Sequence, residues 1–300
     1  MKVVFTLCLC LVLSSQARAV EVLTSIKPLQ LIASAITEGT ATPKLLLPPG
    51  SSPHDYALRP SDVRKIKNAD LVIWVGPELE VFLAPLLASQ EKSVALLSQL
   101  PAIEHAHHHD KHSLVIEDTE QDSHHHHHGS QDPHIWLDPH QAEAIAALIA
   151  KKLSQIDPQN YDRYQTNLAV FQAKLAKVDA KLAAQLAPLQ GIGYFVFHDA
   201  YGHWERHYQL SSLGHFTVNP ARAPGAKTVT RIHHALKQSK AVCVFAEPQF
   251  KPAVVSAVLR NTQARSGVLD PLATDISPSA EGYFRFMEQL AAAMTKCLLN

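Results

Sequence analysis

The sequence lacks a net charge, because its 27 Lys and Arg side chains balance its 27 Asp and Glu side chains. A balanced chain has no overall attraction for nucleic acid, so no nucleic-acid partner is expected. The sequence also lacks a His-Glu-x-x-His motif and a Gly-x-Ser-x-Gly motif, which mark many zinc peptidases and the α/β-hydrolases. These two absences weigh against a hydrolytic enzyme.

The apolar run near the start of the chain is too short to span a bilayer. It covers 3–13, follows Lys2 and precedes Ala17-Arg18-Ala19, which is the order of a cleavable signal peptide. Neither Cys8 nor Cys10 has the small preceding residues expected of a lipidated cysteine. We therefore expect a cleavable signal peptide at 1–19, an exported protein and no membrane insertion.

Cysteine is scarce, with four residues in the chain, of which two lie inside the expected signal peptide. The remaining pair is Cys243, in a strand-like run, and Cys297, in the last expected helix. In an oxidising compartment an even pair is most simply a disulfide. Two separate buried thiols are the alternative.

Strand-like and helix-like segments alternate along most of the chain, which predicts mainly parallel sheets with covered faces. The expected strands are 22–26, 44–47, 70–75, 193–197, 213–218, 241–246 and 266–269. The expected helices outside the centre are 28–37, 61–68, 77–87, 141–153, 200–208, 228–237, 252–260 and 280–298.

A long central helix is predicted over 158–189, where apolar residues recur at steps of three and four. Asp157 stands at the expected N-cap and Pro158 at the first helical position. The predicted fold class is thus α/β: two (β/α) lobes with mainly parallel sheets, joined by one long rigid helix, with a cleft between them. One helix of an all-α bundle is the alternative.

The predicted domains are an N-terminal lobe at 20–156, the linking helix at 157–190 and a C-terminal lobe at 191–300.

Histidine is abundant, with 19 residues, and ten of these fall in one low-complexity stretch with interleaved acids. The stretch, about 102–132, has too little apolar surface to order itself, so a mobile loop is expected. A loop so rich in imidazoles would bind zinc weakly. If it is tethered beside a tighter metal site, it would raise the local zinc concentration there. A solvated insertion without a role is the alternative. Its histidines are His105, His107, His108, His109, His112, His124, His125, His126, His127 and His128.

Five polar residues outside this loop lie next to expected strands or in the loops that follow them: His54, His134, His198, Glu247 and Asp270. In parallel sheets ligands lie beyond the carboxyl ends of the strands, so these five side chains are expected to face one crevice. Three imidazoles and a carboxylate make a four-coordinate set that suits Zn(II) better than Mn(II).

Several segments together resemble the ZnuA family, the periplasmic zinc-binding components of bacterial ABC importers. The segments are Ser51-Ser52-Pro53-His54-Asp55-Tyr56, Leu58-Arg59-Pro60-Ser61-Asp62, Asp132-Pro133-His134-Ile135-Trp136-Leu137-Asp138-Pro139, Tyr194-Phe195-Val196-Phe197-His198-Asp199-Ala200-Tyr201 and Phe245-Ala246-Glu247-Pro248-Gln249. The resemblance covers nearly the whole mature chain and implies two lobes bridged by one long helix, with the metal in the cleft.

The resemblance also implies a ligand set of His54, His134 and His198. Manganese and iron relatives have a carboxylate where His198 stands, so this residue favours zinc. Some zinc members have a glutamate where Pro53 stands, which leaves the fourth position to Asp270 or to water. Glu247 would accept a hydrogen bond from the imidazole of one ligand. The resemblance also implies that His215 belongs to an auxiliary zinc site.

The expected function is capture of Zn(II) as the bound ion and its delivery to an inner-membrane zinc ABC permease, by a monomer that is not an enzyme. Two alternatives stay open: a zinc-dependent hydrolase with Glu247 as base, and a periplasmic zinc buffer based on the His-rich loop. The remaining histidines, His140, His233 and His234, are expected on exposed helix faces. The i, i+4 pair His203 and His207 is also expected on a surface helix, with pairing on a metal ion as the alternative.

Overall fold

The computed structural model describes residues 19–100, 131–217, 224–238, 240–250 and 253–299. Most of the expected signal peptide lies outside the described residues, which include only its last residue, 19. Most of the expected His-rich loop also lies outside them, since only 131 and 132 are described. Within the described ranges, no helix has both the length and the apolarity needed to cross a membrane.

The first lobe is built on a parallel sheet with the strand order β2-β1-β3-β4. Its strands are β1 (Val22–Thr24), β2 (Lys44–Leu45), β3 (Leu71–Trp74) and β4 (Ser93–Ala95). Its helices are α1 (Lys27–Ile36), α2 (Pro60–Asn68), α3 (Ala84–Leu87), α4 (Leu96–Gln99) and α5 (Pro139–Ile156), with short 3-10 turns η1 (Val81–Leu83) and η2 (Ile135–Leu137). Strands β1 and β3 are buried along their whole length, as a covered parallel sheet requires.

The second lobe repeats this plan with the order β6-β5-β7-β8, again parallel. Its strands are β5 (Tyr194–His198), β6 (His215–Thr217), β7 (Cys243–Ala246) and β8 (Arg265–Val268). Its helices are α7 (Gly202–Tyr208), α8 (Ala226–Lys237), α9 (Ala253–Leu259) and α10 (Gly282–Leu299). The predicted α/β class with two lobes is confirmed. The sequence analysis missed β4 and α4, and the helix expected over 77–87 is instead a turn, η1 and α3.

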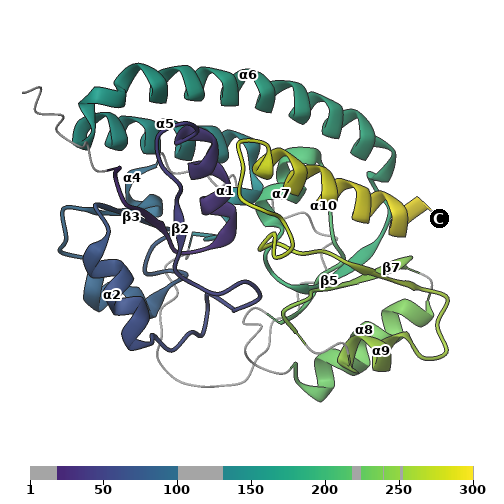
Figure 1. The fold of residues 1–300 in the computed structure, drawn as a ribbon. Coiled ribbons are helices and arrows are strands. Elements are labelled where there is room, and N and C mark those ends of the chain that lie inside the picture. Colours follow the sequence, from purple (N-terminus) through teal and green to yellow (C-terminus); the bar gives the residue numbers. More distant parts are fainter. Residues whose placement is uncertain (1–18, 101–130, 218–223, 239, 251–252, 300) are drawn as a thin grey trace, which may run out of the picture.

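The long helix α6 (Tyr161–Leu186) extends over both lobes (Figure 1). It is flanked by 3-10 turns η3 (Pro158–Asn160) and η4 (Ala187–Leu189), and its 26 residues span about 39 Å. Its buried stripe follows steps of three and four: Tyr164, Asn167, Phe171, Leu175, Val178, Leu182 and Leu186. The helical run over 158–189 is continuous, and Asp157 is its N-cap at the start of η3, as expected. The Asp157 side chain makes no capping bond and instead accepts from Asn160 Nδ2 and the Tyr164 hydroxyl.

Helix α6 is fastened to elements of both lobes. On the first lobe, Asn167 Nδ2 donates to the Ile36 carbonyl at the end of α1 at 2.8 Å. On the second lobe, Lys181 forms an ion pair with Glu288 in α10. Lys174 forms an ion pair with Glu281, which directly precedes α10. Helix α10 also packs directly on α1, and one continuous cluster of buried apolar side chains includes residues from both lobes. The lobes therefore share a core, which restricts their relative movement.

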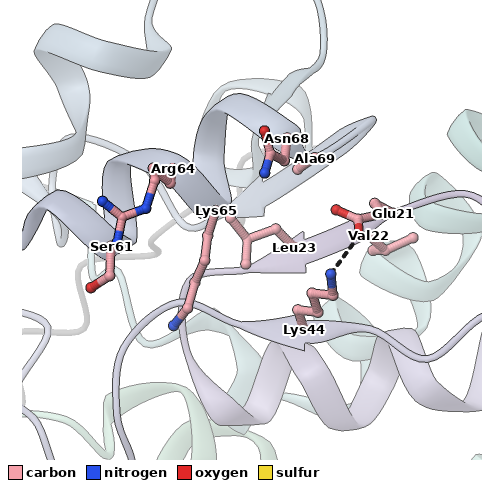
Figure 2. A pocket seen from close by; sticks show the side chains of 9 residues that line it. All are labelled: Glu21, Val22, Leu23, Lys44, Ser61, Arg64, Lys65, Asn68 and Ala69. Carbon is pink, nitrogen blue, oxygen red and sulfur yellow. Dashed lines mark hydrogen bonds and ion pairs between the residues drawn. The ribbon is translucent and has the colours of Figure 1, made fainter.

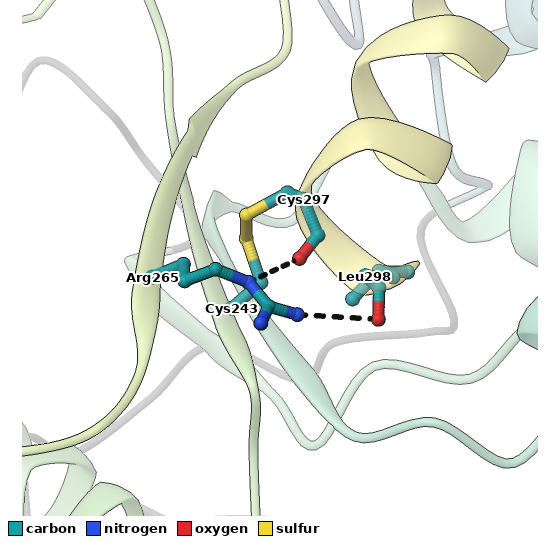
Figure 3. Close-up of a disulfide and its surroundings, with 4 residues drawn as sticks. All are labelled: Cys243, Arg265, Cys297 and Leu298. Atoms are coloured by element: carbon teal, nitrogen blue, oxygen red, sulfur yellow. Dashed lines mark hydrogen bonds between the residues drawn. A yellow bond between two sulfur atoms is a disulfide. The ribbon is translucent and has the colours of Figure 1, made fainter. Parts of the chain in front are cut away.

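A disulfide joins Cys243 in β7 to Cys297 in α10, as predicted, with Cα atoms 6.1 Å apart (Figure 3). Next to it, Arg265 in β8 donates from its guanidinium to the carbonyls of Cys297 and Leu298 at 2.8 and 3.3 Å. These carbonyls belong to the last turn of α10 and have no partner further along that helix. The disulfide and Arg265 thus hold the end of α10 on the second sheet.

Replacing both cysteines (Cys243→Ala with Cys297→Ala) should lower the free energy of unfolding by about 4 kcal/mol on the chain-entropy model, because the bond closes a long loop in the unfolded chain. Urea denaturation of oxidised wild type and of the double variant would measure the difference. Reduced wild type is the matched control and should unfold near the double variant. Equal stability of all three forms would contradict a stabilising disulfide.

Glu80 is a fully buried carboxyl group at the carboxyl ends of β1 and β3. Its oxygens accept from the Ser25 hydroxyl at 2.5 Å and from the Gly76 backbone N–H at 3.0 Å. Burial raises its pKa from 4.5 to about 7, although these hydrogen bonds act in the opposite direction. The folded state therefore retains a proton on Glu80 at a pH where the unfolded chain has lost it.

The stability that comes from this proton is complete below about pH 4.5 and is lost as the pH rises through about 7. Glu80→Gln removes the titration, so its free energy of unfolding relative to wild type should rise by about 2 kcal/mol between pH 5 and pH 8. Urea denaturation at both pH values would measure this. Glu91→Gln, at an exposed position, is the control and should give a flat difference; a flat difference for Glu80→Gln would contradict the raised pKa.

Candidate metal centre

Three histidines from distant parts of the sequence meet between the two lobes. His54 lies in the loop that follows β2, His134 directly precedes η2, and His198 is the last residue of β5. One ring nitrogen from each lies within 4.8 Å of the other two. The ring centroids are 5.1 to 5.5 Å apart. The structure thus brings together the three imidazoles that the sequence analysis selected.

Two carboxylates set the orientation of two of these rings. His198 Nδ1 is 2.7 Å from Glu247 Oε1, and His134 Nδ1 is 2.8 Å from Asp132 Oδ1. A carboxylate accepts, so each Nδ1 carries the proton and each Nε2 of the neutral ring presents a lone pair. The two Nε2 atoms face each other at 3.2 Å. Neutral rings in these tautomers have no proton between the two lone pairs, so the arrangement favours a cation there.

The segment that carries His134 is fixed from several sides. The Asp132 carboxylate also accepts from the His134 backbone N–H at 3.0 Å, an Asx-type turn. Buried Trp136 donates from its indole to the Pro271 carbonyl at 2.7 Å, and Tyr283 donates to the Trp136 carbonyl at 2.8 Å. The Asp132 role was missed by the sequence analysis, although an aspartate two residues before a histidine is the signal for such a turn.

His54 is half-buried, and its ring contacts are with the other two histidines. Burial is the largest cause that lowers its pKa, to about 3, followed by repulsion from His134 and His198; the Asp132 charge acts in the opposite direction. The imidazole is therefore neutral at pH 7. A neutral ring is the form that coordinates a metal ion.

The cavity at this centre is small, about 10 Å³, which is about the room that one water molecule needs. It is lined by residues of both lobes: Ser52, Pro53, His54, His134, Trp136, His198, Glu247, Phe250, Pro271 and Leu272. A larger hollow of about 310 Å³ lies at the opposite, amino ends of β1 and β3, beside α2 (Figure 2). Lys44 and Glu21 form an ion pair there. Because ligands of parallel sheets bind at the carboxyl ends, the small cavity is the candidate site.

Asp270 lies near the centre but is engaged elsewhere. Its carboxylate accepts from Gln249 Nε2 at 2.5 Å and from the backbone N–H groups of Leu272 at 3.1 Å and Thr274 at 2.6 Å. It does not belong to the cluster of ring nitrogens described above, whereas Glu247 contacts His198 directly. Of the two carboxylates that the sequence analysis placed here, the structure brings only Glu247 to a histidine of the cluster.

The auxiliary histidines separate into two sets. His215, in β6, has Nδ1 3.6 Å from Asp199 Oδ1 and is partly exposed. The ten histidines at 105–128 lie outside the described residues.

Of the five remaining histidines, His203, His207 and His233 are less exposed than expected. His203 is fully buried and donates from Nε2 to the Asp132 carbonyl at 2.9 Å, so it does not share an exposed helix face with His207. His233 is half-buried and donates to the Val258 carbonyl at 2.7 Å. His140 and His234 are exposed, as expected. Packing against neighbouring segments, which i, i+4 spacing does not reveal, decides these positions.

Comparisons with known proteins identify the family of this chain. The family model of ZnuA, described as zinc-uptake complex component A, periplasmic, matches residues 22–297. The high-affinity zinc uptake system protein ZnuA of Yersinia pestis is 47% identical over 294 residues, covering 92% of this chain and 91% of that protein. The protein of the same name from Haemophilus ducreyi is 41% identical over 297 residues, covering 93% of each chain.

Solved structures share the fold. A crystal structure of ZnuA, 24% identical, superposes with a TM-score of 0.75 over 94% of this chain and 100% of that one. The laminin-binding adhesin Lmb of Streptococcus agalactiae, in a mutant structure, is 19% identical, with a TM-score of 0.76 over 93% of this chain and 99% of that one. The match over 22–297 and the identities above 40% show that the chain belongs to the ZnuA family of periplasmic zinc-uptake components.

Proposed function

We propose that this protein captures Zn(II) in the periplasm with His54, His134 and His198 and delivers it to an inner-membrane ABC permease. Family membership supports the role in zinc uptake, since the relatives are named high-affinity zinc uptake system proteins. The geometry of the three histidines supports the assignment of the ligands. Zinc is the cargo in this proposal, so the site must both bind the ion and release it.

One observation carries the ligand assignment: the two Nε2 lone pairs of His134 and His198 face each other at 3.2 Å. Ligand nitrogens about 2.0 to 2.1 Å from a tetrahedral zinc ion are about 3.4 Å from each other. The separation of the two Nε2 atoms is therefore close to the separation that zinc requires. The two rings lie in positions from which both could bind one zinc ion.

The donor set selects among metal ions. Three neutral imidazoles suit zinc, whereas Mn(II) and Mg(II) prefer carboxylate and water oxygen. Glu247 and Asp132 accept hydrogen bonds from the imidazole N–H groups of His198 and His134, so they would raise the basicity of these ligands. This combination favours zinc without adding a charged ligand.

Water is the better candidate for the fourth ligand. For Asp270 to coordinate, its carboxylate would have to give up hydrogen bonds to Gln249 and to two backbone N–H groups. The loss of several such bonds at a partly buried carboxylate is costly. A water molecule needs no such rearrangement.

The geometry argues against the hydrolase alternative. A cavity of about 10 Å³ has room for an ion or a water molecule but none for an ester or a peptide. Glu247, the candidate base, is buried and bonded to His198 Nδ1.

We propose that the protein acts as a carrier, as a monomer, and not as an enzyme. No observation on the described residues favours the zinc buffer, whose loop lies outside them.

His198→Ala should weaken the tightest zinc site by orders of magnitude, because it removes one of three ligands. Competition for zinc with a chelator of known affinity would measure the change. His234→Ala, at an exposed position in α8, is the matched control and should bind like wild type. An unchanged affinity in a folded His198→Ala protein would refute the ligand assignment.

Glu247→Gln tests the orienting carboxylate and should lower zinc affinity by about 10- to 100-fold. The amide keeps the size of the side chain but is a weaker acceptor for His198 Nδ1 than a carboxylate. The same chelator competition measures the affinity, and circular dichroism checks the fold. A structural role alone predicts a loss of stability with unchanged affinity, which would count against an orienting role.

A further inference from the structure

A second group of potential metal ligands lies outside the three-histidine centre. It consists of Asp138, His140 and His207, whose donor atoms lie within 4.8 Å of one another. Asp138 and His140 are at the start of α5, whereas His207 is on α7 of the other lobe. The group is distinct from the first centre, because the buried turn η2 (Ile135–Leu137) separates Asp138 from His134.

His207 is oriented in the way that a metal ligand usually is. Its Nε2 donates to Asp179 Oδ1 on α6 at 2.8 Å, and the Tyr208 hydroxyl donates to the same oxygen at 2.9 Å. This bond places the ring proton on Nε2 and leaves a lone pair on Nδ1. Nδ1 is the atom that lies 4.0 Å from Asp138 Oδ1. A carboxylate that holds the far N–H of a histidine is the usual arrangement around a bound metal.

The other two members complete an open set of three donors. His140 Nδ1 is 3.8 Å from Asp138 Oδ1, and the rings of His140 and His207 are nearly perpendicular, with centroids 4.9 Å apart. Ligand atoms of tetrahedral zinc are about 3.4 Å apart, so each donor would move inward by about half an ångström. The His140 side chain is 76% exposed, so it can move and water can fill the fourth position.

Asp138 already serves as the N-cap of α5. Its Oδ1 accepts from the backbone N–H groups of His140 at 2.8 Å and Gln141 at 3.4 Å. Both capping bonds end on Oδ1, the oxygen measured from the two imidazoles, so an ion there would replace the long bond from Gln141 and leave the bond from His140. The positive end of the α5 dipole disfavours a cation there. This site should therefore be weaker than the three-histidine centre.

We propose that Asp138, His140 and His207 form a second, solvent-facing Zn(II) site with water as its fourth ligand. An ion there joins the start of α5 to α7, and through Asp179 it is linked to α6. Two imidazoles and one carboxylate form a donor set of the kind found in zinc sites that keep a fourth position for water. The site would fill only after the three-histidine centre.

The position of the ion can be tested with crystals of the protein grown in excess zinc. An anomalous difference map above the zinc edge should contain a peak between Asp138, His140 and His207, in addition to any peak at the first centre. Absence of the peak while the first centre is full would overturn the proposal. Because the two peaks are separate, failure here is distinguishable from failure of the proposed function.

Affinity at this site can be tested in solution with Asp138→Asn, His140→Ala and the control His234→Ala. Asn caps helices as well as Asp does but is a poor zinc ligand, so Asp138→Asn should keep the fold. Equilibrium dialysis over a range of free zinc concentrations measures the affinities. In Asp138→Asn and His140→Ala, one lower-affinity site should bind zinc about tenfold or more weakly than in wild type. The affinity of the tightest site should not change. The control keeps both sites and the same His-rich loop. Binding curves for Asp138→Asn and His140→Ala that match the control would overturn the proposal.

Discussion

The three-histidine centre depends most on two imidazole–carboxylate hydrogen bonds, His198 with Glu247 and His134 with Asp132. Each bond places a proton on Nδ1 and so turns an Nε2 lone pair toward the crevice. The two Nε2 atoms are 3.2 Å apart. Ligand rings held in place by carboxylates need less rearrangement when they bind a cation, which favours affinity.

Those two bonds are possible because of the way parallel sheets end. His198 closes β5, and Glu247 follows the neighbouring strand β7, so both side chains emerge at the same edge of one sheet. His54 follows β2 of the other sheet. His134 is held between the lobes by its turn with Asp132 and by the contacts of Trp136. The crevice is therefore a consequence of topology, and the ligands come from both lobes.

Much of this could be predicted from the sequence, and the exceptions have physical causes. The spacing of apolar residues predicts strands and helices, because the buried face of each element repeats with a fixed period. Ligands of parallel sheets lie beyond the carboxyl ends of the strands, so a histidine at a strand end could be predicted as a site residue. The short elements β4 and α4 carry too few residues to give a pattern. Burial of His203 and the contact between Asp138 and His207 depend on how α7 packs against α5. Contacts between segments distant in sequence leave no local periodicity to read.

The rigidity of the frame indicates where movement on zinc capture must occur. Helix α6 is bonded to elements of both lobes, and α10 packs on α1 across a shared core. A large closure of the lobes would break these contacts together, at a cost greater than a small local shift. His134 and His198 are buried and fixed by carboxylates. His54, half-buried and carried on a loop, is the ligand that can move with the least disruption, so adjustment of that loop is the natural step in binding and release.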